Sequence, residues 1–421
     1  MLTGLLIYSL FIAADVVWWR FADRRLRGIR RAGAIRAALA LFIAAQCLYL
    51  LWLMVEVLLR GTRDPRPMDW GVLAYLWHVG VLPVCMAIVG FTWLGNRWRR
   101  SRRVPQQTPA PTPTTAGLGI TRRRVLAATA AILPPAVAFA ATGEASAQLG
   151  SFRIRRRELV IPGLPADLDG LTIAQVTDLH LGRFMTAEMA VPMADAANAL
   201  DADVIAFTGD LIDTSAQKVA PGIDFVRRLR PRHGLVLIEG NHDVMQGSER
   251  FEKGLKDAGL PLLLEEAMTL RVRGRATPVQ FLGITWGELK RGSEMHRVGR
   301  ERNLLYRKYT PAARDESVRR LAAQRDPAAF PILLAHHPHA WDAAANAGLP
   351  LVLSGHTHGG QIMLAPDIGA GPLRFRYWSG LYQRPGSQLF ISNGLGSWFP
   401  LRVNAPPEIV HLTLRTAARP A

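Results

Sequence analysis

The chain has 421 residues, a length that allows two or three domains. Its 51 Lys and Arg residues outnumber its 33 Asp and Glu residues, which leaves a formal net charge of +18. Both cysteines, Cys47 and Cys85, lie in apolar segments and exclude a disulfide framework. Much of the excess arginine flanks these segments, so we expect no nucleic-acid partner despite the charge.

Three apolar segments fall within the first hundred residues, and each is long enough to cross a bilayer at about 1.5 Å rise per residue. They are Met1 to Trp19, Ala37 to Leu59 and Gly71 to Gly95. Asp15 and Glu56 lie near segment ends, and we expect their carboxylates to reach the membrane interface. We therefore predict that residues 1–104 form a membrane region with three transmembrane helices.

The distribution of arginine predicts how these helices are oriented. Seven arginines between Arg20 and Arg36 separate the first two segments, and five more lie between Arg97 and Arg103. The connection between the second and third segments has only three, offset by Asp64 and Asp69. The positive-inside rule then places the first and last of these stretches in the cytoplasm. We expect a multi-pass protein of the bacterial cytoplasmic membrane with its N-terminus outside.

Residues 105–120 are rich in Pro and Thr and predict a spacer. Residues 121–147 begin with Thr121-Arg-Arg-Arg-Val-Leu126, continue as an Ala-rich apolar stretch and end near Ala145-Ser-Ala147. This pattern resembles a twin-arginine export signal, which would make the export machinery a partner. The alternative is a fourth transmembrane helix with a basic flank. Both interpretations place the rest of the chain outside the cytoplasm.

Beyond residue 150, aliphatic runs alternate with helix-like stretches, the pattern of an α/β domain. Five runs are followed directly by polar residues. They are Leu171–Thr177 before Asp178-Leu-His180, Asp203–Thr208 before Gly209-Asp210, Gly234–Glu239 before Gly240-Asn241-His242-Asp243, Pro331–Ala335 before His336-His337-Pro338, and Leu349–Ser354 before Gly355-His356-Thr-His358. Open α/β sheets place their chemistry at the C-terminal ends of strands, so these residues are expected to meet in one site.

The donor atoms in this set are oxygens and nitrogens, without sulfur. Such a mixture suits two divalent ions such as Mn, Fe or Zn. Two ions about 3.5–4 Å apart can clamp the attacking and leaving oxygens of an in-line displacement, and they generate hydroxide at neutral pH. Gly209, Gly240, Gly355 and Gly359 would let the backbone approach the metals closely.

The ordered set resembles the calcineurin-like metallophosphoesterase superfamily over roughly residues 150–415. The stretch Gly355 to Gln361, with Ile391 to Gly396 and Pro406-Pro-Glu408, resembles its bacterial membrane-associated branch. The resemblance implies a four-layer α/β/β/α sandwich with a dinuclear metal centre.

The resemblance also assigns roles to individual residues. Metal one would be bound by Asp178, His180 and His358, and metal two by Asn241, His336 and His356, with Asp210 bridging both. His242 would face the scissile phosphate beside Asn241, and Asp243 could orient its ring. Arg183 is a candidate phosphate contact, although a solvated loop arginine is equally consistent. His337 and His339 are interpreted as neighbours without a ligand role.

These observations predict a membrane-anchored hydrolase of phosphate esters that acts through a metal-bridging hydroxide. Basic residues between Lys290 and Lys308, and the aromatic and Arg-rich segment Leu373 to Tyr382, favour an anionic envelope or lipid-linked substrate in contact with membrane lipid. One alternative is a nucleotide or general phosphodiesterase. Another is a membrane-bound sensory or binding module with a vestigial metal site, against which the complete set of ligands argues.

Overall fold

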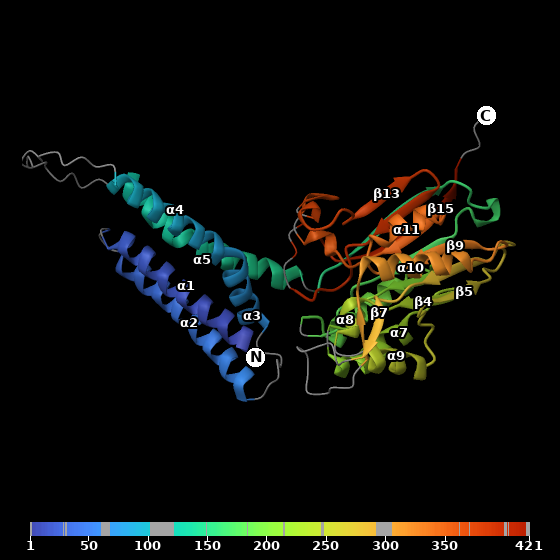
Figure 1. Cartoon of the computed structure of the whole chain (residues 1–421), viewed down its shortest axis with the longest axis horizontal. Helices are drawn as coiled ribbons and strands as arrows, with labels where there is room; N and C mark the ends of the chain where they lie inside the picture. The colour runs from blue at the N-terminus through green and yellow to red at the C-terminus, as the bar shows by residue number, and fades with distance from the viewer. Residues whose placement is uncertain are drawn as a thin grey trace, which may run out of the picture. The chain divides into compact units, whose positions relative to one another are not determined.

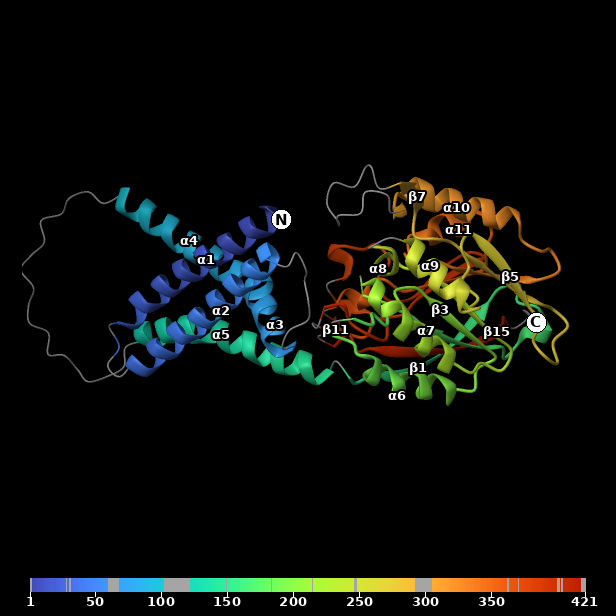
Figure 2. The same cartoon turned by 90° about the horizontal axis from the view of Figure 1, so that it is seen from below.

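The computed structural model describes residues 2–417 except 28, 30–31, 60–67, 102–121, 149, 183, 214, 246–247, 292–304, 362, 370, 400–401 and 403. The Pro/Thr-rich stretch 105–120 thus lies outside the described residues. The chain forms two compact units, Met1–Ser146 and Ala147–Ala421 (Figures 1 and 2). Each unit is described by itself.

The first unit is helical. It contains α1 (Leu2–Leu26), α2 (Gly33–Leu59), α3 (Met68–Tyr75), the π-helical turn η1 (Leu76–Val81), α4 (Leu82–Ser101) and α5 (Arg122–Gln148). Three stretches are long and apolar enough to cross a membrane: Leu5–Leu26, Gly33–Val55 and Gly71–Trp98. The three predicted apolar helices are therefore confirmed. Their outer faces expose large apolar side chains such as Leu41 and Phe91, as expected of a surface that contacts lipid.

Asp15 does not reach an interface as expected but is fully buried within this unit. Trp77 Nε1 donates a hydrogen bond to Asp15 Oδ1 at 2.7 Å, and His78 Nε2 lies 2.9 Å from Oδ2. Both partners belong to the π-helical turn η1, which aims them at the carboxylate. The prediction failed because a buried carboxylate is tolerated where dedicated partners satisfy it. The side chain of Glu56 lies outside the described residues.

The second unit contains two large sheets. The first has the strand order β1 (Arg153–Ile161), β15 (Glu408–Thr416), β2 (Thr172–Val176), β3 (Val204–Thr208) and β4 (Gly234–Ile238). The second has the order β13 (Gly380–Arg384), β14 (Ser387–Ile391), β10 (Leu351–Ser354), β9 (Phe330–Leu334), β6 (Val279–Gly283) and β5 (Glu266–Leu270).

The two sheets face each other across a common core. Ile173 and Val204 of the first sheet pack there with Phe281 and Ile332 of the second. Because side chains alternate along a strand, the next residues, such as Ala174, point to the opposite face. That face of the first sheet is covered by α6 (Ala187–Asn198), α7 (Val219–Arg228) and α9 (Ser248–Asp257).

The outer face of the second sheet is covered by α10 (Pro311–Ala323) and α11 (Ala340–Asn346). In Figure 2 α10 lies at one edge of this unit and α6 at the opposite edge, with strands between them. The domain is the four-layer α/β/β/α sandwich that the sequence predicted.

All five aliphatic runs form strands, and the polar segments follow their C-terminal ends. β2, β3 and β4 are parallel neighbours, as are β9 and β10. Two short hairpins complete the unit: β7 (Glu288–Arg291) with β8 (Leu305–Lys308), and β11 (Met363–Ala365) with β12 (Ile368–Gly369). Most of the basic stretch between Lys290 and Lys308 lies outside the described residues.

Candidate metal centre

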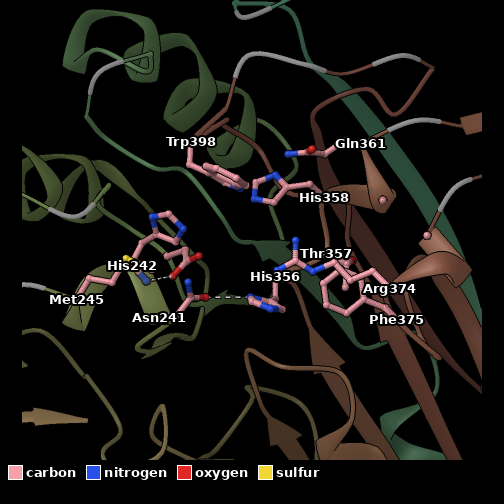
Figure 3. A pocket seen from close by; sticks show the side chains of 13 residues that line it. Asn241, His242, Met245, His356, Thr357, His358, Gln361, Arg374, Phe375 and Trp398 are labelled. Atoms are coloured by element: carbon pink, nitrogen blue, oxygen red, sulfur yellow. Dashed lines mark hydrogen bonds between the residues drawn. The ribbon is translucent and has the colours of Figure 1, made fainter. Parts of the chain in front are cut away.

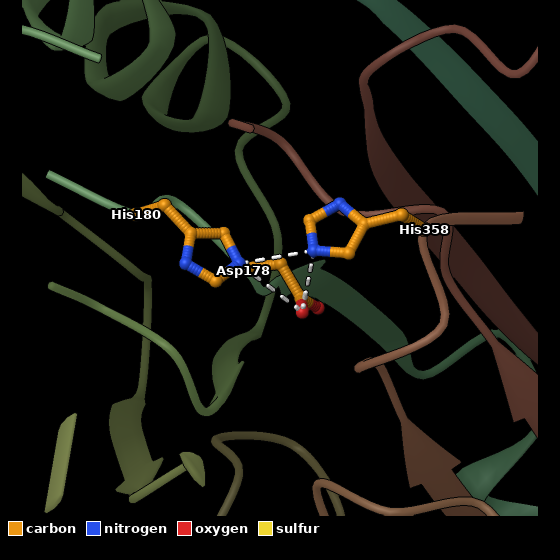
Figure 4. A group of neighbouring side chains, drawn as sticks. All are labelled: Asp178, His180 and His358. Carbon is orange, nitrogen blue, oxygen red and sulfur yellow. Dashed lines mark hydrogen bonds and ion pairs between the residues drawn. The ribbon is translucent and has the colours of Figure 1, made fainter. Parts of the chain in front are cut away.

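Asp178, His180 and His358 form one buried cluster whose ligand atoms all lie within 4.8 Å of one another. His180 Nε2 is 2.9 Å from His358 Nε2, and Asp178 Oδ1 lies 3.4 Å from His358 Nε2 (Figure 4). Nitrogen atoms about 3 Å apart fit two ligands of one ion with metal–nitrogen bonds of about 2.0–2.1 Å. Two distant parts of the chain thus supply one possible ion site.

Asp210, His336 and His356 form a second cluster of the same kind. His336 Nε2 lies 3.1 Å from Asp210 Oδ2. Asn241 joins this cluster, because its Oδ1 is 2.9 Å from His356 Nδ1. The structure therefore groups the predicted ligands in the two sets that the resemblance implied.

Asp210 lies between the two clusters. The same oxygen, Oδ2, is 3.5 Å from His180 Nε2 and 3.1 Å from His336 Nε2. Its second oxygen accepts a hydrogen bond from the backbone N–H of His242 at 2.8 Å. The carboxylate is thus fixed where it can contact an ion in each cluster.

The environment of His336 tests whether a cation fits. Its Nδ1 lies 2.8 Å from the Thr208 carbonyl oxygen, so this nitrogen must carry the proton, and the buried Nε2 faces Asp210 Oδ2 at 3.1 Å. Burial lowers the pKa of His336, but the charges of Asp210 and Asp178 outweigh it and raise the pKa to about 9. The position beside Nε2 therefore demands positive charge, which a divalent ion bound by a neutral imidazole would supply.

Five of the predicted ligands hold their backbone in the left-handed region, which is uncommon for residues other than glycine. The residues, with φ in parentheses, are Asp178 (52°), His180 (52°), Asp210 (56°), His356 (74°) and His358 (50°). Such backbone costs about 1–3 kcal/mol per residue and concentrates at functional sites. This backbone conformation at the strand ends turns the side chains of the five residues toward one another.

Gly240 is needed for a close approach, as the sequence suggested. A Cβ at this position would lie 2.5 Å from the backbone nitrogen of Asp210 and closer still to its carboxylate. Any side chain there would displace Asp210 from its position between the clusters.

The carboxylate that contacts the His242 ring is Asp213, not Asp243 as the sequence suggested. His242 Nδ1 lies 2.9 Å from Asp213 Oδ1. Burial lowers the pKa of His242, but Asp210 and the hydrogen bond to Asp213 together raise it above its ordinary value. Asp213 lies three residues after Asp210, a spacing that could have identified it.

Asp243 instead organises the backbone of the site. Its Oδ2 accepts hydrogen bonds from the N–H groups of Asp210 and Gly240, both at 2.8 Å, and Oδ1 accepts one from Ile212 at 2.9 Å. These bonds tie the start of α8 (Asn241–Val244) to the loop after β3. Burial and the charge of Asp210 raise the pKa of Asp243 to about 7.

The clusters open into a pocket of about 430 Å³. Its walls include three large apolar side chains and one cation, namely Met245, Phe375, Trp398 and Arg374 (Figure 3). The ring centroid of Trp398 lies 5.7 Å from that of His242. Arg183, the predicted phosphate contact, lies outside the described residues, and Arg374 is the arginine that lines the pocket.

Arg402 is a buried contact of the site for which the sequence offered no signal. Its Nη2 donates to His358 Nδ1 at 2.6 Å, and its Nη1 donates to the Asn393 carbonyl at 2.7 Å. The guanidinium therefore holds the His358 ring with Nε2 toward Asp178. The two residues are 44 positions apart, and no spacing rule connects them.

Two clusters of possible metal ligands at the strand ends of a four-layer sandwich are the arrangement expected of the metallophosphoesterase class. The calcineurin-like phosphoesterase model matches residues 171–360. YkuE, an uncharacterized metallophosphoesterase of Bacillus subtilis (strain 168), is 31% identical over 259 residues, which are 60% of this chain and 82% of that protein. The chain belongs to the calcineurin-like phosphoesterase family.

Two other relatives show how far the similarity extends. An uncharacterized metallophosphoesterase of Helicobacter pylori (strain J99 / ATCC 700824) is 29% identical over 247 residues, which are 58% of this chain. The match spans only 60% of that protein's length. Phosphodiesterase YaeI of Escherichia coli (strain K12) is 27% identical over 304 residues, which are 70% of this chain and 99% of that protein.

Proposed function

We propose that this membrane-anchored metallophosphoesterase uses two divalent ions to hydrolyse a phosphoester of the cell envelope or a lipid-linked phosphoester. The observation that carries the proposal is the position of Asp210 Oδ2, within 3.5 Å of a histidine nitrogen in each cluster. One carboxylate oxygen between two sets of ligands is what a pair of neighbouring ions requires.

Seven side chains would hold the ions: Asp178, His180, Asp210, Asn241, His336, His356 and His358. The bound ions would act as Lewis acids toward the phosphate and lower the pKa of a water molecule that attacks phosphorus. His242 lines the pocket, and its Nδ1 is hydrogen-bonded to Asp213. The other ring nitrogen of His242, Nε2, is therefore the one that can exchange a proton with the substrate. The hydrogen bond to Asp213 would favour a proton on Nε2, and the ring would donate that proton to the leaving oxygen.

Features of the pocket support a substrate that is both anionic and apolar. Arg374 provides positive charge at the wall, while Phe375 and Trp398 provide apolar surface. The anchoring helices would hold this pocket near a membrane, where tethering raises the local concentration of an enzyme relative to lipid. The name of the E. coli relative, a phosphodiesterase, favours a diester and keeps a nucleotide or general phosphodiesterase as the second candidate.

We further propose that the protein is a multi-pass protein of the bacterial cytoplasmic membrane, with residues 150–415 as the catalytic domain on the outer side. The arginine distribution supports this orientation. Residues 121–147 would act as a twin-arginine signal or as a fourth spanning helix. In the structure residues 122–147 belong to the helix α5, which contains Pro134 and Pro135.

Metal analysis and phosphatase assays on the full chain test the proposal. We expect about two divalent ions per chain and hydrolysis of phosphate esters. The Asp210→Ala variant should lose both metal and activity, whereas Asp257→Ala, at an exposed ion pair on α9, should keep both. Full activity of Asp210→Ala would refute the mechanism, and one ion per chain would refute the dinuclear centre.

A further inference from the structure

Three large apolar side chains in the segment that leads to the pocket residues Arg374 and Phe375 are highly exposed. Leu364 is 83% exposed, Ile368 61% and Leu373 91%. They are the most exposed large apolar side chains among the described residues of the second unit, where Val160 follows at 50%. All three fall within ten residues of sequence. We call Leu364, Ile368 and Leu373 the apolar edge.

A small separate core lies beneath the apolar edge. It links the β11–β12 hairpin, which carries Leu364 and Ile368, to the segment that carries Leu373. Met363 of β11 is buried against Trp378 and Ala405, and Phe375 packs on the same cluster. The hairpin β11–β12 and the segment around Leu373 are therefore held together from beneath. Because the inward positions are already filled, the three apolar side chains remain on the outside.

Local glycine packing fixes the backbone beside Leu373. A Cβ at Gly371 would overlap the Trp378 ring, and a Cβ at Gly360 would lie 2.6 Å from the backbone of Gly371. Thr357, next to two predicted metal ligands, donates a hydrogen bond to the Trp378 carbonyl at 2.6 Å. The apolar edge is thus connected to the metal centre through tightly packed residues.

Positive charge accompanies the apolar edge. Arg374 follows Leu373 directly, Arg376 lies two residues further on, and both are exposed. The acidic groups nearby are engaged: Asp342 pairs with Arg384 and, at 3.7 Å, with Arg376, while Asp367 pairs with Arg155 at 2.7 Å. Apolar tips beside arginines are the combination that binds the interface of an anionic bilayer.

We propose that the apolar edge inserts into the surface of the bilayer that anchors the chain, an anionic lipid membrane. Leu373 precedes Arg374 and Phe375, which line the pocket. Insertion of Leu373 would therefore bring the pocket next to the lipid surface. A lipid-linked phosphoester could then enter without crossing water. This last step rests on the proposed function, whereas membrane contact itself does not.

Fluorescence quenching by lipid tests the contact without any need for catalysis. The full chain, with Cys47→Ala and Cys85→Ala, would carry an environment-sensitive dye at Leu373→Cys or Ile368→Cys in anionic nanodiscs. Val160→Cys is the matched control, since this exposed apolar residue lies on β1, outside the apolar edge. We expect doxyl-labelled lipids to quench the dye at 373 and 368 at least threefold more than at 160. Equal quenching at all three positions would overturn the proposal, as would dye burial that depends on a second copy of the chain.

A pair of matched substrates tests what the contact does. The double variant Leu364→Ser, Leu373→Ser should lower kcat/KM about tenfold for a chromogenic phosphodiester whose acyl chain sits in the nanodisc. It should leave kcat/KM unchanged for the same diester without the acyl chain. An equal loss on both substrates would overturn the role in substrate entry. If neither diester is hydrolysed by the parent chain, the proposed function fails while the quenching result still decides on membrane contact.

Discussion

Asp213 accepts a hydrogen bond from Nδ1 of His242 at 2.9 Å, across the gap between the loop after β3 and the start of α8. This contact fixes the orientation of the ring that faces the pocket. We expect Asp213→Ala to lower kcat roughly 10²-fold, the loss that follows when a catalytic group is misplaced by about 1 Å. Metal content should stay at the level of the parent chain.

A double-variant cycle separates this role from a structural one. His242→Ala should lower kcat by about 10²–10⁴-fold with metal retained. Because Asp213 acts through His242, the combined variant should be no slower than His242→Ala alone. Multiplicative losses would show that Asp213 works independently of the ring.

We expect substitution of Asp243 to lower stability, in contrast to substitution of Asp213, which should lower kcat. Its carboxylate accepts three backbone hydrogen bonds, and the amide group of Asn offers only one oxygen to replace the two. Asp243→Asn should therefore cost about 1–3 kcal/mol of stability for a buried donor left unsatisfied. Thermal unfolding with metal analysis would measure this, and an unchanged Tm together with a large loss of kcat would contradict the assignment.

Gly240→Ala should abolish metal binding although it adds a single methyl group. The new Cβ would collide with the backbone and carboxylate of Asp210, which lies between the two clusters. The control is Gly150→Ala, where the nearest atom to a Cβ is Met189 Cε at an ordinary 3.7 Å. Metal content measured on both purified variants decides the matter, and full metal occupancy in Gly240→Ala would show that the site can relax around the methyl group.

The strands and the meeting of the candidate ligands in one site were predictable because each buried strand ends in a polar segment, whereas the division into two sets came from the family resemblance. The sheet itself positions residues that directly follow a strand, such as Asp178 and Asp210. Arg402 reaches the site through a loop whose path depends on tertiary packing, and no local pattern encodes that path. Asp243 was misinterpreted because it is the sequence neighbour of His242, whereas the ring meets Asp213, a carboxylate that follows β3 instead of β4.

The burial of Asp15 leads to a prediction about the helical unit. Asp15→Ala would leave the Trp77 N–H and the His78 ring without their partner inside an apolar bundle. We expect a loss of about 1–3 kcal/mol from the stability of this unit, seen as earlier thermal unfolding of the full chain in detergent. Ser9→Ala is the control, since its hydroxyl donates a hydrogen bond to the Leu5 carbonyl on an exposed face of the same helix. Metal content per folded chain should not change in either variant, because all the proposed ligands lie in the other unit.

The orientation of the chain in the membrane can be tested with fusions. Arginines crowd the connection between the first two apolar helices and the end of the third, and the positive-inside rule keeps such stretches in the cytoplasm. A reporter that is active only outside the cytoplasm should therefore be silent after Arg27 or Arg103 and active after Ala421. Replacing the arginines between Arg20 and Arg36 with Gln should weaken this pattern, because the charge that retains the connection is lost. Activity after Arg27 together with silence after Ala421 would invert the topology and place the metal centre in the cytoplasm, where a lipid-linked substrate would have to come from the inner leaflet.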